Sequence, residues 1–308
     1  YPQPATLIVL ASQTARALRA RGQRTVQLGY DTSLYTGPGL APGWLPSYVT
    51  TGNVSAITPL EVDQGRVTSA GTPVDADAGG GLRSAVPAQL AANVFAGYLA
   101  VDGITVRGAA QQVTAPTGAT TLASVQSPPL AEIVQWMLEE SNNVIAENLA
   151  RQVAIATGQP ASFSGGAAAV TSVLRGLGVT GELELYDGSG LSPTDKIAPA
   201  VLVKLIRLAA TTAQLRTVLT GLPVEGFSGT LLPGGSVFGG GGDAGLGVVR
   251  AKTGNLDNVV ALAGSAYAQD GQLLAFAVMA DQVPSDALAS AAAQMVDLAS
   301  ALAGCGCQ

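Results

Sequence analysis

Apolar residues recur every three to four positions in two stretches of the N-terminal third, and each stretch ends at a glycine ahead of a short strand-like run. Residues 4–22 show this spacing and lead into the run at 25–28. The second stretch opens at Pro87, a favourable first-turn residue, and gives way at Gly103 to the run at 104–106. The pattern predicts two amphipathic helices, each followed by a strand. A weak internal duplication and a chance likeness between two helix–strand units both explain the similarity.

The segment between these two units has less periodic pattern. Residues 37–46 are rich in glycine and proline and contain Trp44, which predicts an irregular connector anchored by one aromatic side chain. Residues 54–67 predict one or two strands. Residues 68–86 are small and polar, and the glycine run at 79–81 is expected to be their most mobile point.

The rest of the chain alternates between helical and strand patterns. Helical spacing predicts helices at 129–140, 144–156, 166–177, 199–209 and 215–219. The first of these is expected to begin at a Ser127 cap and to bury its apolar face. That face consists of Leu130, Ile133, Val134 and Met137. A short strand at 183–186 is predicted to lead into a tight turn at 187–190.

Three strand patterns follow one another near the C-terminus. They cover residues 248–253, 259–268 and 273–280, and turn residues separate the last two. Such spacing predicts an antiparallel meander. The last helical pattern, 287–302, is apolar but includes Asp297, so we expect a buried amphipathic helix that packs on the meander.

Composition narrows the class of protein. The chain has 308 residues, enough for one large or two medium domains, and a net charge of −6. The acidic balance and the absence of a basic stripe argue against nucleic-acid binding. Hydrophobic residues make up 47% of the chain. Alanine accounts for much of that share, and no window of 18 apolar residues lacks a polar interruption, so no transmembrane helix is predicted.

The sequence contains no histidine. This excludes Ser-His-Asp and Cys-His catalysis and most zinc sites, so we predict no metal site, and a lysine must act as the base in any acyl transfer. Cys305 and Cys307 lie in the tail, and their pairing stays open because so small a ring would be strained. Tyr1 is not an initiator methionine, so the chain is expected to be a processed product or a fragment.

One stretch, 250–255, combines a strand pattern with charged and hydroxyl side chains. It contains Lys252, one of three lysines, followed by Thr253 and Gly254, and then the hydrophobic run 259–263. An ammonium and a hydroxyl on one strand can bind an anionic ligand, and the missing Cβ of Gly254 would let a substrate backbone lie close. For the triplet alone, an edge strand with one solvated lysine is the alternative interpretation.

A polar cluster interrupts the helical pattern about a hundred residues earlier. Ser141, Asn142 and Asn143 lie between the helix predicted at 129–140 and the helix from Val144. Serine and asparagine favour helix breaks and caps over helix interiors, so the cluster is placed at the junction of these helices. Taken alone, a simple helix corner explains it as well as a functional site does.

The two clusters stand in an order that a known family shares. Ser141-x-Asn143 between helices, then Lys252-Thr253-Gly254 on a strand, resembles the S-x-N and K-T-G motifs of serine β-lactamases and penicillin-binding proteins. Further stretches bring the chain close to the class C low-molecular-mass penicillin-binding proteins, the D-Ala-D-Ala carboxypeptidase/endopeptidase family. These stretches are Ser141 to Glu147, Asp187 to Ser192, Leu222 to Val224, Gly229 to Leu231, Trp44, and Ala56 to Leu60.

The resemblance covers most of the chain and implies its architecture and activity. It implies an α+β catalytic domain over residues 124–308, with an antiparallel sheet flanked by helices, and an inserted accessory region over 1–123. It implies serine acyl transfer on peptidoglycan peptides that end in D-Ala-D-Ala, binding of β-lactam antibiotics, and no cofactor. Because that substrate lies in the cell wall, the protein is expected to be exported to the cell envelope.

The resemblance also implies a role for each site residue. Ser141 would pass protons between a catalytic lysine and the leaving amine, and Asn143 would bind the substrate backbone or hold that lysine. Lys252 and Thr253 would bind the terminal carboxylate. The backbone N–H of Asn255 would supply half of an oxyanion hole. By contrast, the polar residues of the turn at 187–190 are expected to form the turn rather than to take part in chemistry.

One family motif, S-x-x-K, is missing from these 308 residues. No serine is followed by a lysine three positions later, and Ser192 precedes Lys196 by four. We therefore expect the nucleophile to lie upstream of Tyr1 in the intact protein. The alternatives are a catalytically silent peptidoglycan-binding protein and a β-lactamase.

Overall fold

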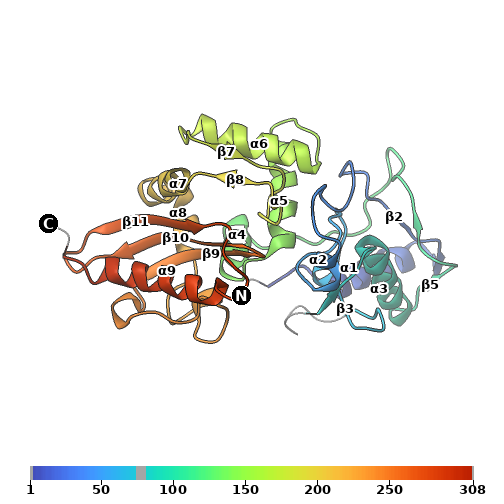
Figure 1. The fold of residues 1–308 in the computed structure, drawn as a ribbon. Coiled ribbons are helices and arrows are strands. Elements are labelled where there is room, and N and C mark those ends of the chain that lie inside the picture. The colour runs from blue at the N-terminus through green and yellow to red at the C-terminus, as the bar shows by residue number, and fades with distance from the viewer. Residues whose placement is uncertain (1–2, 74–80, 307–308) are drawn as a thin grey trace.

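A computed structural model of the chain describes residues 3–73 and 81–306. Figure 1 shows two lobes side by side, an N-terminal lobe drawn in blue to teal and a C-terminal lobe drawn in green to red. Gly79 and Gly80, in the glycine run that was predicted to be mobile, lie outside the described residues. Cys307 also lies outside them, so its pairing with Cys305 stays open. The boundary at residue 123 stays a prediction.

Two long helices and two small parallel strand pairs are the main elements of the N-terminal lobe. α1 (Leu7–Ala20) packs against α3 (Pro87–Val101). β1 (Thr25–Val26) pairs in parallel with β5 (Thr105–Val106), and β2 (Gly29–Tyr30) with β6 (Gln111–Gln112). The two helix–strand units predicted from the sequence thus lie side by side around one apolar core. That core consists of Ala11, Ala15, Leu18, Leu99 and Ile104.

The strands predicted at 54–67 are almost absent. Within 54–67 the described chain has only β3 (Arg66–Val67), which pairs with β4 (Leu82–Arg83), and the single helical turn α2 (Ser47–Thr50) precedes this stretch. Val54 and Ile57 are buried in a cluster shared by the two lobes. Side-chain packing rather than a hydrogen-bonded ladder therefore fixes this segment, which is why the prediction was wrong.

The C-terminal lobe is built on an antiparallel meander. β9 (Val249–Leu256), β10 (Val259–Tyr267) and β11 (Leu273–Ala280) form a sheet with β10 in the middle. α9 (Leu288–Ala303) packs mainly on β10, and α7 (Pro199–Thr211) lies mainly on β11, on the other side of the sheet in Figure 1. This is the predicted α+β layering, and it buries the side chains of Val249, Leu262, Val296 and their neighbours.

The C-terminal lobe has further helices and one short strand pair. They are α4 (Leu130–Glu139), α5 (Asn143–Ala156), α6 (Phe163–Gly176), β7 (Leu183–Glu184), which pairs with β8 (Lys196–Ile197), and α8 (Arg216–Thr220). Among these helices α5 packs most extensively on α6.

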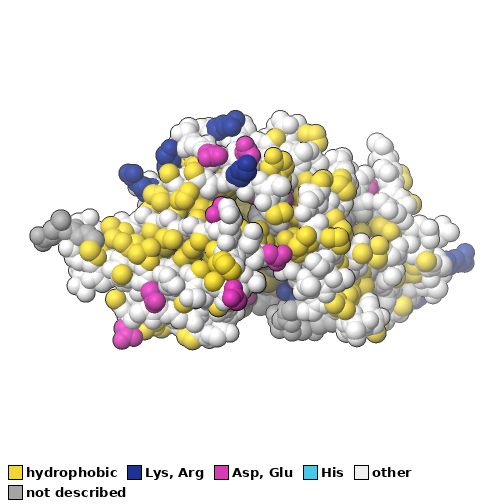
Figure 2. Space-filling view, in the orientation of Figure 1, with side chains coloured by type: hydrophobic (Ala, Val, Ile, Leu, Met, Phe, Trp, Pro, Cys, Tyr) yellow, Lys and Arg dark blue, Asp and Glu magenta, His cyan; other side chains and the backbone are white. Residues whose placement is uncertain are grey.

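Charged side chains are sparse on the face shown in Figure 2, where basic ones gather mainly over the α6 and α7 end.

The predicted start of α4 was correct to within one residue, but its predicted cap was wrong, and its apolar face is only partly buried. Pro129 occupies the N-cap position without a side-chain hydrogen bond, so Ser127 does not cap the helix. No residue of α4 is fully buried, and Leu130 is 63% exposed. Periodicity identifies an apolar face, but it does not determine whether another element covers that face.

A third apolar cluster joins the two lobes. Trp44, Tyr48 and Val54 from the N-terminal lobe pack with Val144 and Phe163 from α5 and α6. The rings of Trp44 and Phe163 meet edge to face, with centroids 5.1 Å apart. The N-terminal lobe is thus packed directly against the beginning of α5. Within the described residues, no helix is both long and apolar enough to cross a membrane.

Candidate active site

Ser141 and Lys252 meet where α5 begins beside β9. The Nζ atom of Lys252 donates a hydrogen bond of 2.7 Å to Oγ of Ser141. Ser141 lies in the short break between α4 and α5 and adopts a left-handed backbone conformation with φ of 53°. Lys252 lies within β9, opposite Ala263 of β10. The break turns the serine hydroxyl toward the strand, and the sheet holds the ammonium in a fixed place.

The environment of Lys252 favours loss of its proton. Burial lowers the pKa of Lys252 to about 8. Its hydrogen bonds within the described residues go to two neutral acceptors, Ser141 Oγ and the backbone oxygen of Thr253 at 3.0 Å. An ammonium without a paired carboxylate can bind an incoming anion. It can also exchange a proton with the serine hydroxyl near neutral pH.

Thr253 is held by a residue that the sequence analysis did not assign to the site. Its Oγ1 atom lies 2.8 Å from Oγ1 of Thr230. Thr230 follows Gly229, which has φ of 55° and lies so close to the end of α4 that a Cβ there would clash with the backbone oxygen of Glu139. The glycine therefore lets this loop approach α4 and places Thr230 against β9. The only signal for Thr230 was its membership of the matching stretch 229–231.

The outer edge of β9 is open where a peptide could bind. The segment 223–225 covers the beginning of this edge, through the bonds from Glu225 N to Val249 O and from Ala251 N to Pro223 O. In the described sheet β9 has no other strand on this side. Gly254 and Asn255 lie beyond the covered part, opposite Ala261 and Val260 of β10. A substrate backbone can add to such an exposed edge.

The two asparagines that follow Ser141 face the N-terminal lobe. Asn142 caps α5, because its Oδ1 accepts from the backbone N–H of Ile145 at 3.0 Å, and its Nδ2 donates to Oε1 of Gln64 at 2.8 Å. Nδ2 of Asn143 donates to the backbone oxygen of Asn53 at 3.1 Å. The sequence analysis gave Asn142 no role of its own and missed Gln64 and Asn53, because nothing in a sequence pairs positions so far apart.

All six site residues predicted from the sequence lie on two neighbouring segments of the chain. The break before α5 supplies Ser141 and Asn143, and β9 supplies Lys252, Thr253, Gly254 and Asn255. The structure joins Ser141 to Lys252 by a hydrogen bond, whereas Asn143 bonds to Asn53. The catalytic and substrate-binding roles of these residues stay predictions.

A comparison with known families identifies the family of the chain. The family model described as D-Ala-D-Ala carboxypeptidase 3 (S13) matches residues 71–302. The chain belongs to the S13 family. The resemblance drawn from the motifs is thereby confirmed.

Curated and solved relatives extend the comparison. Carboxypeptidase DacB of Mycolicibacterium smegmatis is 37% identical over 300 residues, which cover 96% of this chain and 62% of the relative. A carboxypeptidase of Mycobacterium tuberculosis is 35% identical over 294 residues, which cover 94% of this chain and 60% of the relative. The S13 chain therefore spans about 60% of the length of these relatives.

The fold is that of a solved penicillin-binding protein. Penicillin binding protein 4 of Haemophilus influenzae superposes with a TM-score of 0.70 at 22% identity, covering 88% of this chain and 72% of that one. A second structure of that protein, complexed with a novel β-lactam, gives a TM-score of 0.56 at 29% identity over 63% of this chain and 45% of that one. The predicted α+β penicillin-binding fold is confirmed.

In this S13 chain the turn after β7 has the structural role that the sequence predicted. The buried carboxylate of Asp187 accepts from the backbone N–H groups of Gly190 and Ser192, and from the indole nitrogen of Trp44 at 2.8 Å. The backbone N–H groups of 188 and 189 bond to Glu147 on α5. Asp187 is thus a turn former, and Trp44 is a packing anchor that also ties the lobes together.

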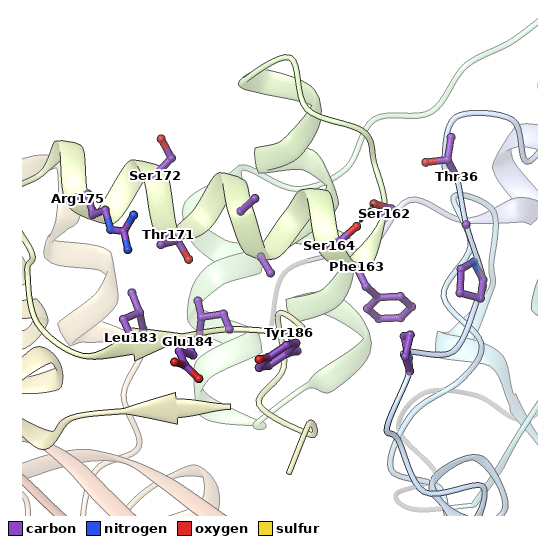
Figure 3. A pocket seen from close by; sticks show the side chains of 16 residues that line it. Thr36, Ser162, Phe163, Ser164, Thr171, Ser172, Arg175, Leu183, Glu184 and Tyr186 are labelled. Carbon is purple, nitrogen blue, oxygen red and sulfur yellow. Dashed lines mark hydrogen bonds between the residues drawn. The ribbon is translucent and has the colours of Figure 1, made fainter. Parts of the chain in front are cut away.

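The S13 chain also has a large surface groove away from this site. Figure 3 shows it between α6, the strand β7 and the segment 36–42, with Thr171, Arg175 and Glu184 among the side chains that face it. Its volume is about 1020 Å³, and neither Ser141 nor Lys252 is among its lining residues. The proposed chemistry below therefore belongs to the β9 site and not to this groove.

Proposed function

We propose that the intact protein is a serine-type D-alanyl-D-alanine carboxypeptidase that trims the stem peptides of peptidoglycan and is acylated by β-lactams. The observation that carries the proposal is the 2.7 Å contact between Lys252 and Ser141. In a chain of the S13 family, this contact joins the S-x-N and K-T-G motifs into one site. The names of the relatives support the same activity.

The reaction would proceed through an acyl-enzyme. A serine from an S-x-x-K segment outside these 308 residues would bond to the carbonyl carbon of the penultimate D-alanine. The bond to the terminal D-alanine would break, and its nitrogen would receive a proton through Ser141. Water would then hydrolyse the ester and release the shortened peptide.

Each described residue has a place in this reaction. Lys252 and Thr253 bind the terminal carboxylate, the former as a compact charge and the latter as a hydroxyl donor. The open edge of β9 carries the substrate backbone past Gly254. The backbone N–H of Asn255 is one donor to the oxyanion, and the N–H of the nucleophile is the other.

Fluorescent penicillin tests the proposal. The full-length protein is incubated with the labelled drug and separated on a denaturing gel, and release of D-alanine from a peptide ending in D-Ala-D-Ala is followed in parallel. We expect a covalent label and D-alanine release. A folded full-length protein that shows neither would contradict the proposal.

The absence of S-x-x-K from the 308 residues favours one alternative, a catalytically silent peptidoglycan-binding protein. Such a protein would sediment with isolated peptidoglycan yet take up no label. A β-lactamase, the other alternative, would take up the label and release it within seconds as hydrolysed drug.

We also propose that the protein acts in the cell envelope. The reason is that the proposed substrate is part of the cell wall. Fractionation of the source cells should place the protein with the envelope or the medium, and its recovery only with ribosomes and other interior components would contradict this.

A further inference from the structure

We propose that Gln64, a residue of the N-terminal lobe, is a positioning residue for the proposed acylation reaction: it holds the break between α4 and α5 in the conformation that directs Ser141 at Lys252. This inference rests on the proposed function. It adds a residue from the N-terminal lobe to the residues that the sequence analysis assigned to the site. In the described structure Gln64 makes no hydrogen bond to Ser141 or Lys252. It therefore acts through Asn142, to which it is hydrogen-bonded.

The contact between Gln64 and Asn142 has a defined direction. Oδ1 of Asn142 is occupied by the backbone N–H of Ile145, at 3.0 Å, in the cap of α5. The other end of that amide must therefore be the donor, and it bonds to Oε1 of Gln64 at 2.8 Å. The cap of α5 and the contact between lobes are thus made by a single side chain, one position after Ser141.

Gln64 adopts an unfavourable local conformation, which contacts within its own lobe hold in place and from which its side chain reaches Asn142. Its backbone is left-handed, with φ of 55°, although it is not a glycine. Its side chain is 9% exposed, and its Nε2 has no hydrogen-bond partner among the described residues. A strained, buried and half-satisfied amide persists where the surrounding structure requires it, and such residues cluster at functional sites. The side-chain hydrogen bond that this state provides is the one to Asn142.

Arg83 fixes this state from behind. Its guanidinium donates from Nη1 to the backbone oxygen of Gln64 at 2.9 Å and from Nε to the backbone oxygen of Gly52 at 3.0 Å. Gly52 precedes Asn53, whose own oxygen accepts from Asn143. One guanidinium therefore ties together the two segments that contact the asparagines after Ser141. Burial lowers the pKa of Arg83 to about 10, so the guanidinium is still charged at neutral pH.

The consequence reaches the chemistry through Ser141. This residue is also left-handed, and it is followed at once by the residue that Gln64 holds. Without that contact the break can relax toward a regular helix, which turns the hydroxyl away from Lys252. A misplacement of about 1 Å can slow a reaction by on the order of 100-fold. The strand itself stays in place, because β9 is held by β10, so Lys252 and Thr253 remain available to the substrate carboxylate.

The test uses three variants of the full-length protein and the kinetics of penicillin acylation. Gln64→Met keeps the length of the side chain but cannot bond to Asn142. Gln64→Glu restores an acceptor. Gln89→Met is the matched control, because it removes a glutamine that accepts from Tyr30 inside the N-terminal lobe. We expect Gln64→Met to lower the acylation rate constant about 10- to 100-fold with the drug concentration at half-saturation unchanged. Gln64→Glu should recover most of the rate, and Gln89→Met should match the wild type.

A second measurement keeps the inference separate from the proposed function. The lysines are labelled at ¹³Cε, and the titration of Lys252 is followed by NMR in wild type and in Gln64→Met. Loss of the Ser141 contact should expose the ammonium and shift its titration toward that of a free lysine. An unlabelled wild type contradicts the proposed function, whereas an unchanged Lys252 titration overturns the role of Gln64. A wild type that is labelled, with Gln64→Met labelled at the same rate, also overturns it.

Discussion

Lys252 and Ser141 are 111 residues apart in the sequence, yet the lysine Nζ lies 2.7 Å from the serine Oγ. The lysine comes from the meander and the serine from the helical side of the same lobe. This contact brings a hydroxyl, an ammonium and the open edge of a strand together in one site. The predictions below test what each part contributes.

The charge of Lys252 should make substrate binding pH-dependent. Because the pKa of Lys252 is lowered to about 8, its ammonium is lost as the pH rises through that value. Acylation efficiency toward a peptide with a free terminal carboxylate should therefore fall above about pH 8. A peptide whose terminal carboxylate is amidated should lack this limb. The check is kcat/KM for both peptides from pH 6 to 10.

Lys252→Gln in the same comparison isolates the contact. The variant should lose several kcal/mol toward the acid peptide if the ion pair is shielded from water, and nearer 1 kcal/mol if it is exposed. It should be almost unchanged toward the amide peptide. Equal losses for the two peptides would show that Lys252 does not contact the carboxylate.

Ser141→Ala and Ser141→Gly should separate catalysis from stability. Both remove the hydroxyl, so both should slow penicillin acylation by on the order of 100-fold. Glycine adopts φ of 53° without the Cβ penalty, whereas alanine does not, so Ser141→Gly should be more stable than Ser141→Ala by about 1 kcal/mol. Urea unfolding measures the difference. Wild-type acylation by either variant would rule out the proton-transfer role of Ser141.

Trp44→Phe should weaken the contact between the lobes. The change keeps an aromatic ring against Phe163 but removes the donor to the buried Asp187 carboxylate. A hydrogen bond to a charged group contributes about 2 kcal/mol, and we expect a loss of that order in the free energy of unfolding. The control is Tyr30→Phe, which removes a neutral hydrogen bond within the N-terminal lobe and should cost about 1 kcal/mol. Equal losses would show that the bond between the lobes has no special weight.

Gly229→Ala should abolish penicillin labelling even where the protein still folds. A Cβ at this position clashes with the backbone oxygen of Glu139, so the loop must move and draw Thr230 away from Thr253. Gly234 has a similar positive φ of 75° but open space around it, so Gly234→Ala shows the cost of strain alone. Labelling of the two variants to the same extent would contradict this account of Thr230.

Local pattern determined most of the C-terminal lobe. The meander, the last helix, and the break between α4 and α5 could all be predicted from the sequence, because turn residues interrupt runs of regular period. The site residues on β9 and before α5 could be predicted for another reason, because their order and residue types match those of a known family. The extent of burial of α4 could not be predicted, because an apolar face does not show how fully a neighbouring element covers it.

Only the tertiary structure decided how the two lobes cooperate. Trp44 and Asp187 are 143 residues apart, and Gln64 and Asn142 are 78 apart, so no local period or motif connects either pair. A sequence states which side chains can cap, turn or donate. Which donor meets which acceptor depends on the packing of whole elements, and here the shared apolar cluster around Trp44 sets that packing and brings Gln64 to the residue beside Ser141.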